Sequence, residues 1–233
     1  MSMTKQAAEH FVWHLMSHYL PRDDTAGATS RSRAALATLR RGLGKAPGQA
    51  PEVFRYVVPA LPPGDLDDQQ EADYYLVAAL FALHPPKAGA ALDRPDFGAA
   101  MRELSQRVTT RRRPADAPQA AEGGDDDDSG ALDPGVERRM AALLAASRDD
   151  LPDHLRHAVG LLSTHEEIPV GWARLLYDLG RWDSPDRAAQ RKWARSFWAS
   201  ASPKAPTAGA AIAATEQAGT GDDSDDSDDS GDN

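Results

Sequence analysis

The sequence DQQEADYYLVAALFALH, residues 68–84, contains the stretch that decides the fold. Residues 74–83 are apolar on nearly every side of a helix, and apolar and polar residues do not alternate as they would in a half-buried strand. Asp67 or Asp68 stands where an N-cap would accept backbone N–H groups. We therefore expect a buried central helix that runs from one of these two aspartates to His84.

The segments on either side of this helix also carry helical signals. Apolar residues recur at helical spacing, Pro and Gly mark the ends, and no alternating run is long enough to predict a strand. The expected helices cover about 4–20, about 30–41, a short element opened by Pro51, the central helix, about 97–108, one started by Asp133 and Pro134, one opened by Pro152, one introduced by Pro169, and one started by Ser184 and Pro185. The prediction is an all-α protein of about nine helices in two packed helical bundles.

Charge is distributed unevenly along the chain. The 233 residues carry 36 acidic and 26 basic side chains, for a formal net charge of −10. Residues 114–135 and residues 201–233 each contribute −7, so the other 178 residues hold 25 basic against 21 acidic side chains and carry +4. Both acidic segments lack aromatic residues and are rich in Gly, Ser and Asp, which predicts disorder. The acidic total therefore does not exclude nucleic-acid binding by the remaining, mildly basic part.

These patterns divide the chain into four parts. We predict an N-terminal helical part over 1–113, an acidic disordered insert over 114–135, a C-terminal helical part over 136–200 and a disordered acidic tail over 201–233. The chain has no cysteine, and we find no signal peptide and no apolar run long enough to cross a membrane. We expect a cytoplasmic protein with no membrane partner.

Arginines recur on one side of two predicted helices. Arg33 and Arg40 point almost the same way, and Arg187, Arg191 and Arg195 follow one another every four residues. Such a row presents several fork-shaped donors to phosphate oxygens. The alternative is that these rows are simply solvated faces of the helices.

Aromatic residues and histidines have competing interpretations. Trp172, Trp193 and Phe197 fall at apolar-periodic positions and are expected in the core rather than as base-stacking platforms, whereas Trp182 and Trp198 are less constrained. His10, His14 and His18 could in pairs reach a metal ion, but three histidines in line cannot converge on one ion, so we expect a polar helix flank. We expect no cofactor.

No arrangement of residues typical of an active site is present in the sequence. The segment HEE (165–167) lacks the second histidine of a zinc protease, and GLGK (42–45) does not follow a strand as a phosphate loop would. We therefore expect no enzymatic activity.

Several motifs in order resemble the CasB family, the small subunit of the type I-E CRISPR surveillance complex called Cascade. The matching motifs are RRGLGK (40–45) with PG (47–48), YLVAALFALHP (75–85), ERR (137–139), RDDLP (148–152), HLR (154–156), IPVGW (168–172), WD (182–183) and QRKWARSFW (190–198). Gly171 stands where the family suggests an acidic residue, Ala188 and Ala189 replace a bulkier pair, and the acidic insert and tail have no counterpart in the family.

The resemblance implies a non-catalytic helical subunit of a guide-RNA-directed DNA-surveillance complex in antiviral defence. Its implied partners are other Cascade subunits, a second copy of itself, the crRNA and target DNA. Family members hold the target strand and the displaced strand through basic residues, which stabilises the R-loop, and recognition is expected to be independent of sequence. The alternative is a helical protein–protein adaptor with no direct nucleic-acid contact.

The resemblance also selects among the basic residues. The candidates for phosphate contact are Arg33, Arg40, Arg41, Lys45, Arg138, Arg139, Arg148, Arg187, Arg191 and Arg195. The cluster 111–113 is a weaker candidate beside the acidic insert, and Arg156 is an alternative ion-pair partner of Asp153 or Asp178. A further hypothesis is that the acidic segments compete with DNA for the basic faces.

Overall fold

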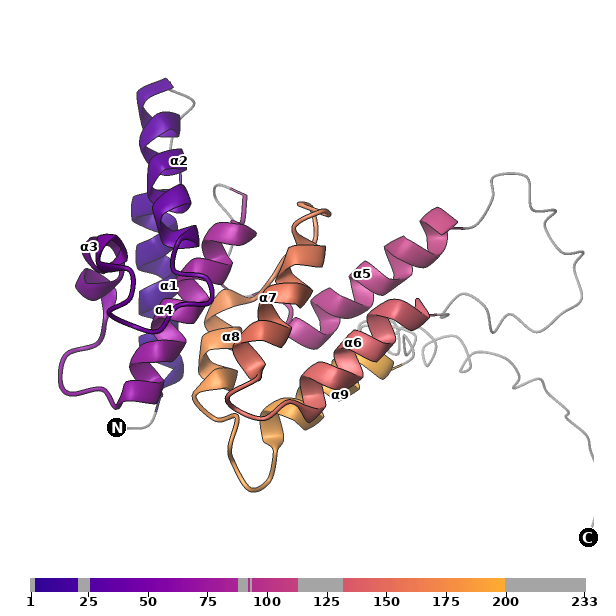
Figure 1. Ribbon diagram of the computed structural model, residues 1–233. Coiled ribbons are helices and arrows are strands. Elements are labelled where there is room, and N and C mark those ends of the chain that lie inside the picture. Colours follow the sequence, from indigo (N-terminus) through magenta and orange to yellow (C-terminus); the bar gives the residue numbers. More distant parts are fainter. Residues whose placement is uncertain (1–2, 21–25, 88–91, 93, 113–131, 200–233) are drawn as a thin grey trace, which may run out of the picture. The chain divides into compact units, whose positions relative to one another are not determined.

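A computed structural model of the chain describes residues 3–20, 26–87, 92, 94–112 and 132–199. Within these ranges the chain forms nine α-helices and two short 3₁₀ segments, with no strand, which confirms the all-α prediction (Figure 1). The elements are α1 (Lys5–Tyr19), α2 (Ala26–Arg40), η1 (Pro51–Val53), α3 (Phe54–Val57), η2 (Val58–Ala60), α4 (Asp68–Leu83), α5 (Phe97–Arg112), α6 (Pro134–Ala145), α7 (Leu151–Leu162), α8 (Trp172–Leu179) and α9 (Ala188–Trp198). No helix in these ranges is long and apolar enough to span a membrane.

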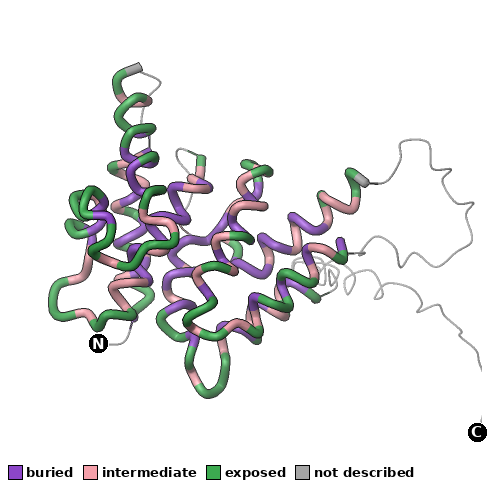
Figure 2. The backbone as a smooth tube through the Cα atoms, viewed as in Figure 1, coloured by how far each residue is buried: buried purple, intermediate pink, exposed green. Residues whose placement is uncertain are grey.

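Helix α4 is the central helix that the sequence predicts. It begins with a capping box, in which the Asp67 side chain accepts the Gln70 N–H at 2.8 Å while the Gln70 side chain accepts the Asp67 N–H. Nine of its residues between Asp73 and Ala82 are buried. Figure 2 shows mostly buried residues along this helix after its first turn, whereas the neighbouring α2 carries many exposed residues.

Helices α1 and α2 and the short elements pack around α4. Thr4 caps α1 by accepting the Ala7 N–H at 3.1 Å. At the other end of α1, the Tyr19 hydroxyl donates to the Tyr56 carbonyl at 3.0 Å and so ties α1 to α3. Both helices bury one apolar stripe and leave the opposite side to solvent.

Helices α5 and α9 approach each other very closely. At Gly98 an added Cβ would lie 2.1 Å from the Trp193 carbonyl oxygen, a distance that no side chain can occupy without moving one of the helices. The contact is extended by the Arg102 guanidinium, which donates to the Phe197 carbonyl at 2.8 Å. Glycine at position 98 therefore sets the spacing of this helix pair.

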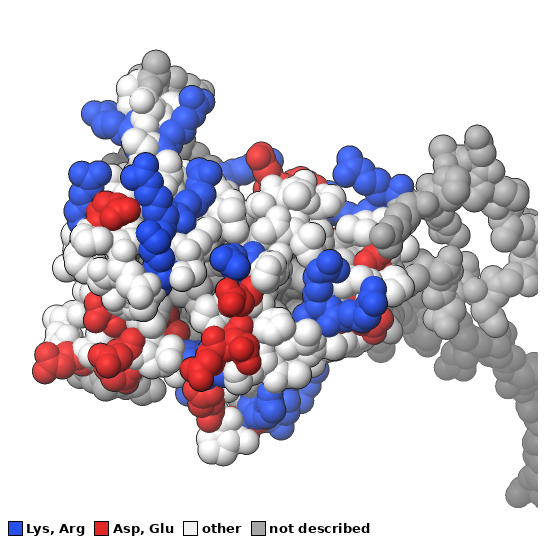
Figure 3. Space-filling model, in the orientation of Figure 1, with Lys and Arg blue, Asp and Glu red and all other residues white. Residues whose placement is uncertain are grey.

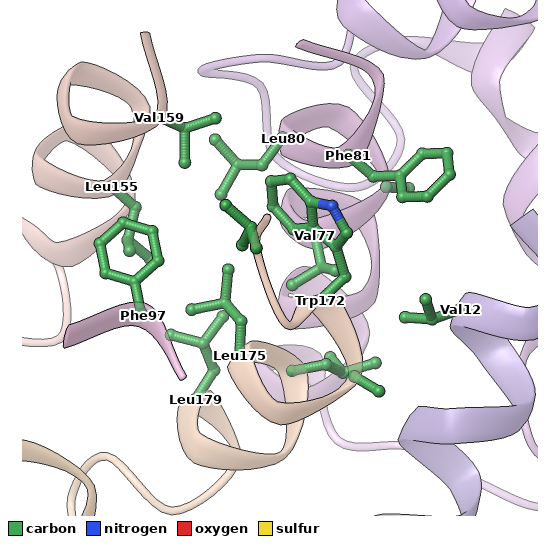
Figure 4. Packing of buried hydrophobic residues seen from close by; sticks show 14 of the residues in the cluster. Val12, Val77, Leu80, Phe81, Phe97, Leu155, Val159, Trp172, Leu175 and Leu179 are labelled. Atoms are coloured by element: carbon green, nitrogen blue, oxygen red, sulfur yellow. The ribbon is translucent and has the colours of Figure 1, made fainter. Parts of the chain in front are cut away.

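The two predicted helical bundles share one core. Helix α8 belongs to the C-terminal part of the sequence but packs on α1 and α4, and α7 also contacts α4. Figure 4 shows Val12 of α1, Val77, Leu80 and Phe81 of α4, Leu155 and Val159 of α7, and Trp172, Leu175 and Leu179 of α8 around the same interior. The described residues of Met1–Ala199 form one compact unit.

Some helix ends differ from the sequence-based prediction. Helix α2 begins at Ala26 rather than near residue 30, and α5 extends to Arg112 rather than ending near 108. The predicted start of the last helix at Ser184 and Pro185 is wrong, because Arg187 has a left-handed backbone (φ 48°) and α9 begins only after it. The predicted insert, 114–135, also ends too late, because Pro134 and Gly135 form the first turn of α6.

The acidic insert up to residue 131 and the whole tail 201–233 lie outside the described residues. The prediction that they are disordered remains a prediction.

Candidate nucleic-acid interface

A first set of exposed basic residues lies at the C-terminal end of α2. Leu36 and Leu39 anchor the helix in the core, and Arg33 and Arg40 project from its exposed side. Arg41 and Lys45 are exposed in the turn that follows, where Gly44 adopts a left-handed conformation (φ 72°). Figure 3 shows basic side chains gathered over α2.

Arg156 of α7 lies against this turn. A Cβ added at Gly44 would be 3.2 Å from the Arg156 Nη1 atom, so glycine leaves room for the guanidinium. Arg156 also forms a partly exposed ion pair with Asp153 at 3.4 Å, one of the two partners that the sequence suggests. We call Arg33, Arg40, Arg41, Lys45 and Arg156 the first basic group.

The second set lies on α6 and α9. The Arg187 Nη2 donates to the Leu144 carbonyl near the end of α6 at 2.8 Å, and the Trp198 Nε1 donates to Glu137 near its start at 2.8 Å. These contacts make α6 and α9 antiparallel neighbours (Figure 1). The exposed residues Arg138, Arg139, Arg187, Arg191 and Arg195 are together called the second basic group.

Three guanidinium groups of the second basic group are held by backbone carbonyls. Arg138 donates to Pro134 at 3.2 Å, Arg139 donates to Gly135 at 2.9 Å, and Arg187 donates to Leu144. Because a guanidinium has five N–H donors in a rigid fork, one such bond orients the group and still leaves donors for a phosphate. The contacts therefore position these arginines and do not neutralise them.

Arg148 has different surroundings from the other candidates. Its side chain is only 14% exposed, its guanidinium forms an ion pair with the buried Asp73 of α4, and its Nη1 donates to the Leu179 carbonyl at 2.8 Å. Burial raises the pKa of Asp73, and the charge and hydrogen bonds of Arg148 oppose that rise. Arg148 thus joins α4, α8 and the α6–α7 connection, and we leave it out of both basic groups.

Acidic side chains separate the two basic groups on the face shown in Figure 3. Asp149 and Asp153 line a cavity of about 340 Å³ together with Lys45 and Arg148. Asp150 and Asp183 are also exposed, and Asp183 lies 4.0 Å from the Arg148 Nε. A phosphate backbone is therefore attracted to either group more than to the surface between them.

The aromatic residues mostly serve the core. Trp172, Trp193 and Phe197 are buried, as predicted, and Trp182 is buried as well. Trp198 is 39% exposed beside the second basic group, with its ring edge-on to Phe197. Of the cluster 111–113, Arg111 is exposed on α5, and Arg113 lies outside the described residues.

The three histidines of α1 lie along one polar flank of the helix, where His14 and His18 stack on each other. The rings of His14 and His18 lie 4.1 Å apart, and the His14 Nε2 is 3.3 Å from the Tyr19 hydroxyl. Burial and the neighbouring histidines lower the pKa of His14. Within the described part of the chain, no three His, Cys, Asp or Glu side chains are grouped to hold a metal ion.

Comparison with known proteins gives one consistent family. The family model for the CRISPR-associated protein Cse2 matches residues 35–198. A Cse2 protein of Thermus thermophilus is 35% identical over 167 residues, which cover 71% of this chain and 79% of that protein.

Solved structures agree with the family model. A crystal structure of a Cse2-family protein from Thermus thermophilus matches with a TM-score of 0.55 and 31% identity over 86% of this chain and 100% of that one. CasB of M. ruber matches with a TM-score of 0.52 and 26% identity over 78% and 90% of the two chains. A chain in a CRISPR RNA-guided surveillance complex matches with a TM-score of 0.56 and 26% identity over 83% and 92%. This chain therefore belongs to the Cse2 family of CRISPR-associated proteins, the CasB family that its sequence motifs resemble.

Proposed function

We propose that the protein is a non-catalytic subunit of a type I-E, crRNA-guided surveillance complex (Cascade) in the cytoplasm. Its partners are the other subunits of the complex, a second copy of itself, crRNA and target DNA. The family membership and the likeness to a chain of a surveillance complex support this assignment.

Within that complex, the two basic groups bind phosphate backbone without reading sequence. The observation that carries this proposal is the gathering of exposed Arg and Lys into two groups on a chain with a net charge of −10. Exchanging a DNA duplex for an RNA–DNA hybrid is nearly balanced in free energy. Modest contacts to the target or displaced strand are therefore enough to stabilise an R-loop.

The first test removes two residues of the first basic group. Arg40→Ala with Arg41→Ala should weaken binding of a labelled single-stranded oligonucleotide in a fluorescence-anisotropy titration. Each lost phosphate contact on a single strand changes the slope of log K against log salt by about 0.7, so we expect a slope shallower by about 1.4.

The matched control is Lys87→Ala with Arg107→Ala. It also removes two positive charges, but Lys87 lies outside both groups and Arg107 is already paired with Glu103 and Glu167 at 2.7 Å. If both double variants lose the same amount of oligonucleotide affinity, the loss comes from the change in net charge, and a local phosphate site at Arg40 and Arg41 is contradicted.

A specific observation favours the adaptor as a second candidate function. Trp13 and Val58 are each 51% exposed, and Phe54 is 36% exposed, and exposed large apolar side chains are what a protein partner would cover. An adaptor would copurify with helical partner proteins and bind no oligonucleotide, even at about 50 mM salt where phosphate contacts are strongest.

A further inference from the structure

The cavity of about 340 Å³ beside Lys45 is lined by three segments that are distant in the chain. One is a face of α4, on which Gln69, Ala72 and Leu76 follow one another at helical spacing. The others are the turn after α2 and the α6–α7 connection with the first turn of α7. Small-molecule sites measure roughly 300–1,000 Å³, so a cavity at the low end of this range offers room for one nucleoside.

Most of the charge in the lining is already neutralised. Arg148 is paired with Asp73, and the Asp153 carboxylate is paired at 3.4 Å with an arginine of the same helix. Within the described part of the chain, the exposed side chains of Lys45 and Asp149 form no ion pair and no hydrogen bond. One free ammonium group and one free carboxylate in the same cavity suit a ligand that carries both a negative group and N–H donors.

The lining also includes apolar surface that suits a flat ring. Ala72 and Leu76 of α4 and the rings of Pro47 and Pro152 are partly exposed and line the cavity. A nucleobase has two flat π-faces that such surface can cover, and its hydrogen-bonding groups lie only around its edge. The cavity therefore has groups for each part of a nucleotide: apolar side chains for the faces of the base, a carboxylate for its edge and an ammonium group for its phosphate.

The Asp149 carboxylate distinguishes between the bases because an ionised carboxylate only accepts hydrogen bonds. Guanine presents two neighbouring donors on its Watson–Crick edge, the N1–H and the 2-amino group. Thymine and uracil place a single N–H between two carbonyl oxygens, which a carboxylate repels, and adenine and cytosine place one amino group next to an acceptor nitrogen. Guanine is therefore the base whose donors match the two carboxylate oxygens best.

We propose that this cavity binds one unstacked guanine nucleotide of a strand that the first basic group holds. The guanine edge donates to Asp149, its ring lies against the apolar lining, and its phosphate contacts Lys45. A strand that is already single costs little to unstack, so the displaced strand of an R-loop suits the site. The inference rests on the proposed phosphate binding and adds a preference for one base, which phosphate contacts alone do not supply.

Oligonucleotides of equal length test this preference in fluorescence-anisotropy titrations of the full-length protein. One strand contains only thymine, and the other alternates thymine with guanine. A bidentate contact to a base is worth about 5-fold or more in affinity, and guanine stands at every second position, so we expect the alternating strand to bind about threefold tighter. A third strand carries inosine, which is guanine without the 2-amino group, and should lose most of this preference.

Asp149→Asn tests the residue that reads the base. The amide keeps the size of the side chain, but it replaces one acceptor oxygen by a donor that faces the N–H groups of guanine, so the affinity ratio of the two strands should fall to about one. Asp150→Asn makes the same charge change at the next residue, which is not among the described residues of the lining, and should keep a ratio of about three. Because each ratio compares two strands on one protein, the general effect of net charge cancels.

The outcomes separate this inference from the proposed function. If wild-type protein binds the all-thymine and the alternating strand equally well, phosphate binding stands and the guanine site is overturned. The site is also overturned if the preference survives in Asp149→Asn, or if the inosine strand binds as tightly as the guanine strand. If no strand binds at all, both the proposed function and this inference are wrong.

Discussion

At the scale of single residues, Arg148 shows how one guanidinium can serve stability instead of binding. Its ion pair with Asp73 is almost closed to solvent, with side-chain exposures of 14% and 3%. Arg148→Ala would leave the Asp73 carboxylate buried without its counter-charge, and we expect a loss of about 3–5 kcal/mol in the free energy of unfolding. Urea unfolding followed by circular dichroism measures this loss.

Arg156→Ala is the matched control for that experiment. The Arg156 and Asp153 side chains are 42% and 69% exposed, so water screens their ion pair and its removal should cost less than about 1 kcal/mol. If the two variants lose similar amounts of unfolding free energy, Arg148 has no special structural role.

The sequence could not separate Arg148 from the other arginines for a physical reason. Asp73 lies 75 residues earlier in the chain, and only the packing of α4 against the α6–α7 connection brings the pair together. One hint was present, because an aspartate directly before a wholly apolar helical stretch requires a buried partner. Arg156 could not be placed from the sequence either. Its contact with Gly44 depends, like the Arg148–Asp73 pair, on the packing of segments that are distant in the chain.

At the scale of elements, the α5–α9 contact gives a sharp prediction. Gly98→Ala places a methyl group where the Trp193 carbonyl oxygen lies, so the helices must separate, and we expect a loss of about 1–3 kcal/mol in the free energy of unfolding. Gly160→Ala on α7 meets no atom within 4 Å and should instead stabilise by about 0.5–1 kcal/mol. Thermal unfolding of both variants should show melting temperatures that move in opposite directions from wild type.

The histidine flank of α1 gives the protein a pH dependence. The pKa of His14 is lowered in the folded state, so below the ordinary histidine pKa of about 6.5 the unfolded chain binds a proton that the folded chain resists. Stability should therefore fall as pH decreases from about 7 to about 5. His14→Gln should flatten this profile of melting temperature against pH, whereas His10→Gln, which removes only the smallest of the causes that lower the pKa of His14, should flatten it less.

Most helices were predictable because local chemistry marks their ends. The caps at Asp67 and Asp133 and the wholly apolar stretch of α4 agree with the structure because they act within a few residues. The start of α9 was not predictable, since Ser184 and Pro185 form a plausible cap but the chain makes another turn through Arg187 before the helix begins. There the carbonyl of Leu144 holds the Arg187 side chain, and this partner is 43 residues away.

At the scale of the whole molecule, the acidic tail contributes −7 to the net charge of −10, as much as the acidic insert does. Deleting residues 201–233 changes the formal charge from −10 to −3. Less repulsion from phosphate should strengthen non-specific DNA binding by about threefold or more at 50 mM salt, and the effect should shrink at high salt because of screening.

A charge-neutral tail is the control for this deletion. Replacing the seven tail aspartates (222, 223, 225, 226, 228, 229 and 232) by asparagine keeps the length and removes most of the charge. If this full-length variant binds DNA as weakly as wild type while the deletion binds tightly, chain length rather than charge is responsible, and the electrostatic explanation is wrong.

The assembly of the candidate site from two halves of the chain was only partly predictable. The sequence indicated the arginine rows on α2 and α9 through their spacing, but not that α6 lies antiparallel to α9 and adds Arg138 and Arg139 to the same surface.

The place of α8 between the two halves has a consequence for synthesis of the chain. The apolar sides of α1 and α4 are completed by α8, and Trp172 at its start follows the last residue of α4, Leu83, by 89 residues. At ribosome speeds of about 5–20 residues per second, roughly 4–18 s pass between the emergence of α4 and that of α8. During this interval the apolar surfaces of α1 and α4 that α8 later covers are exposed on the nascent chain. We therefore expect the N-terminal half to depend on chaperones until α8 has been synthesised.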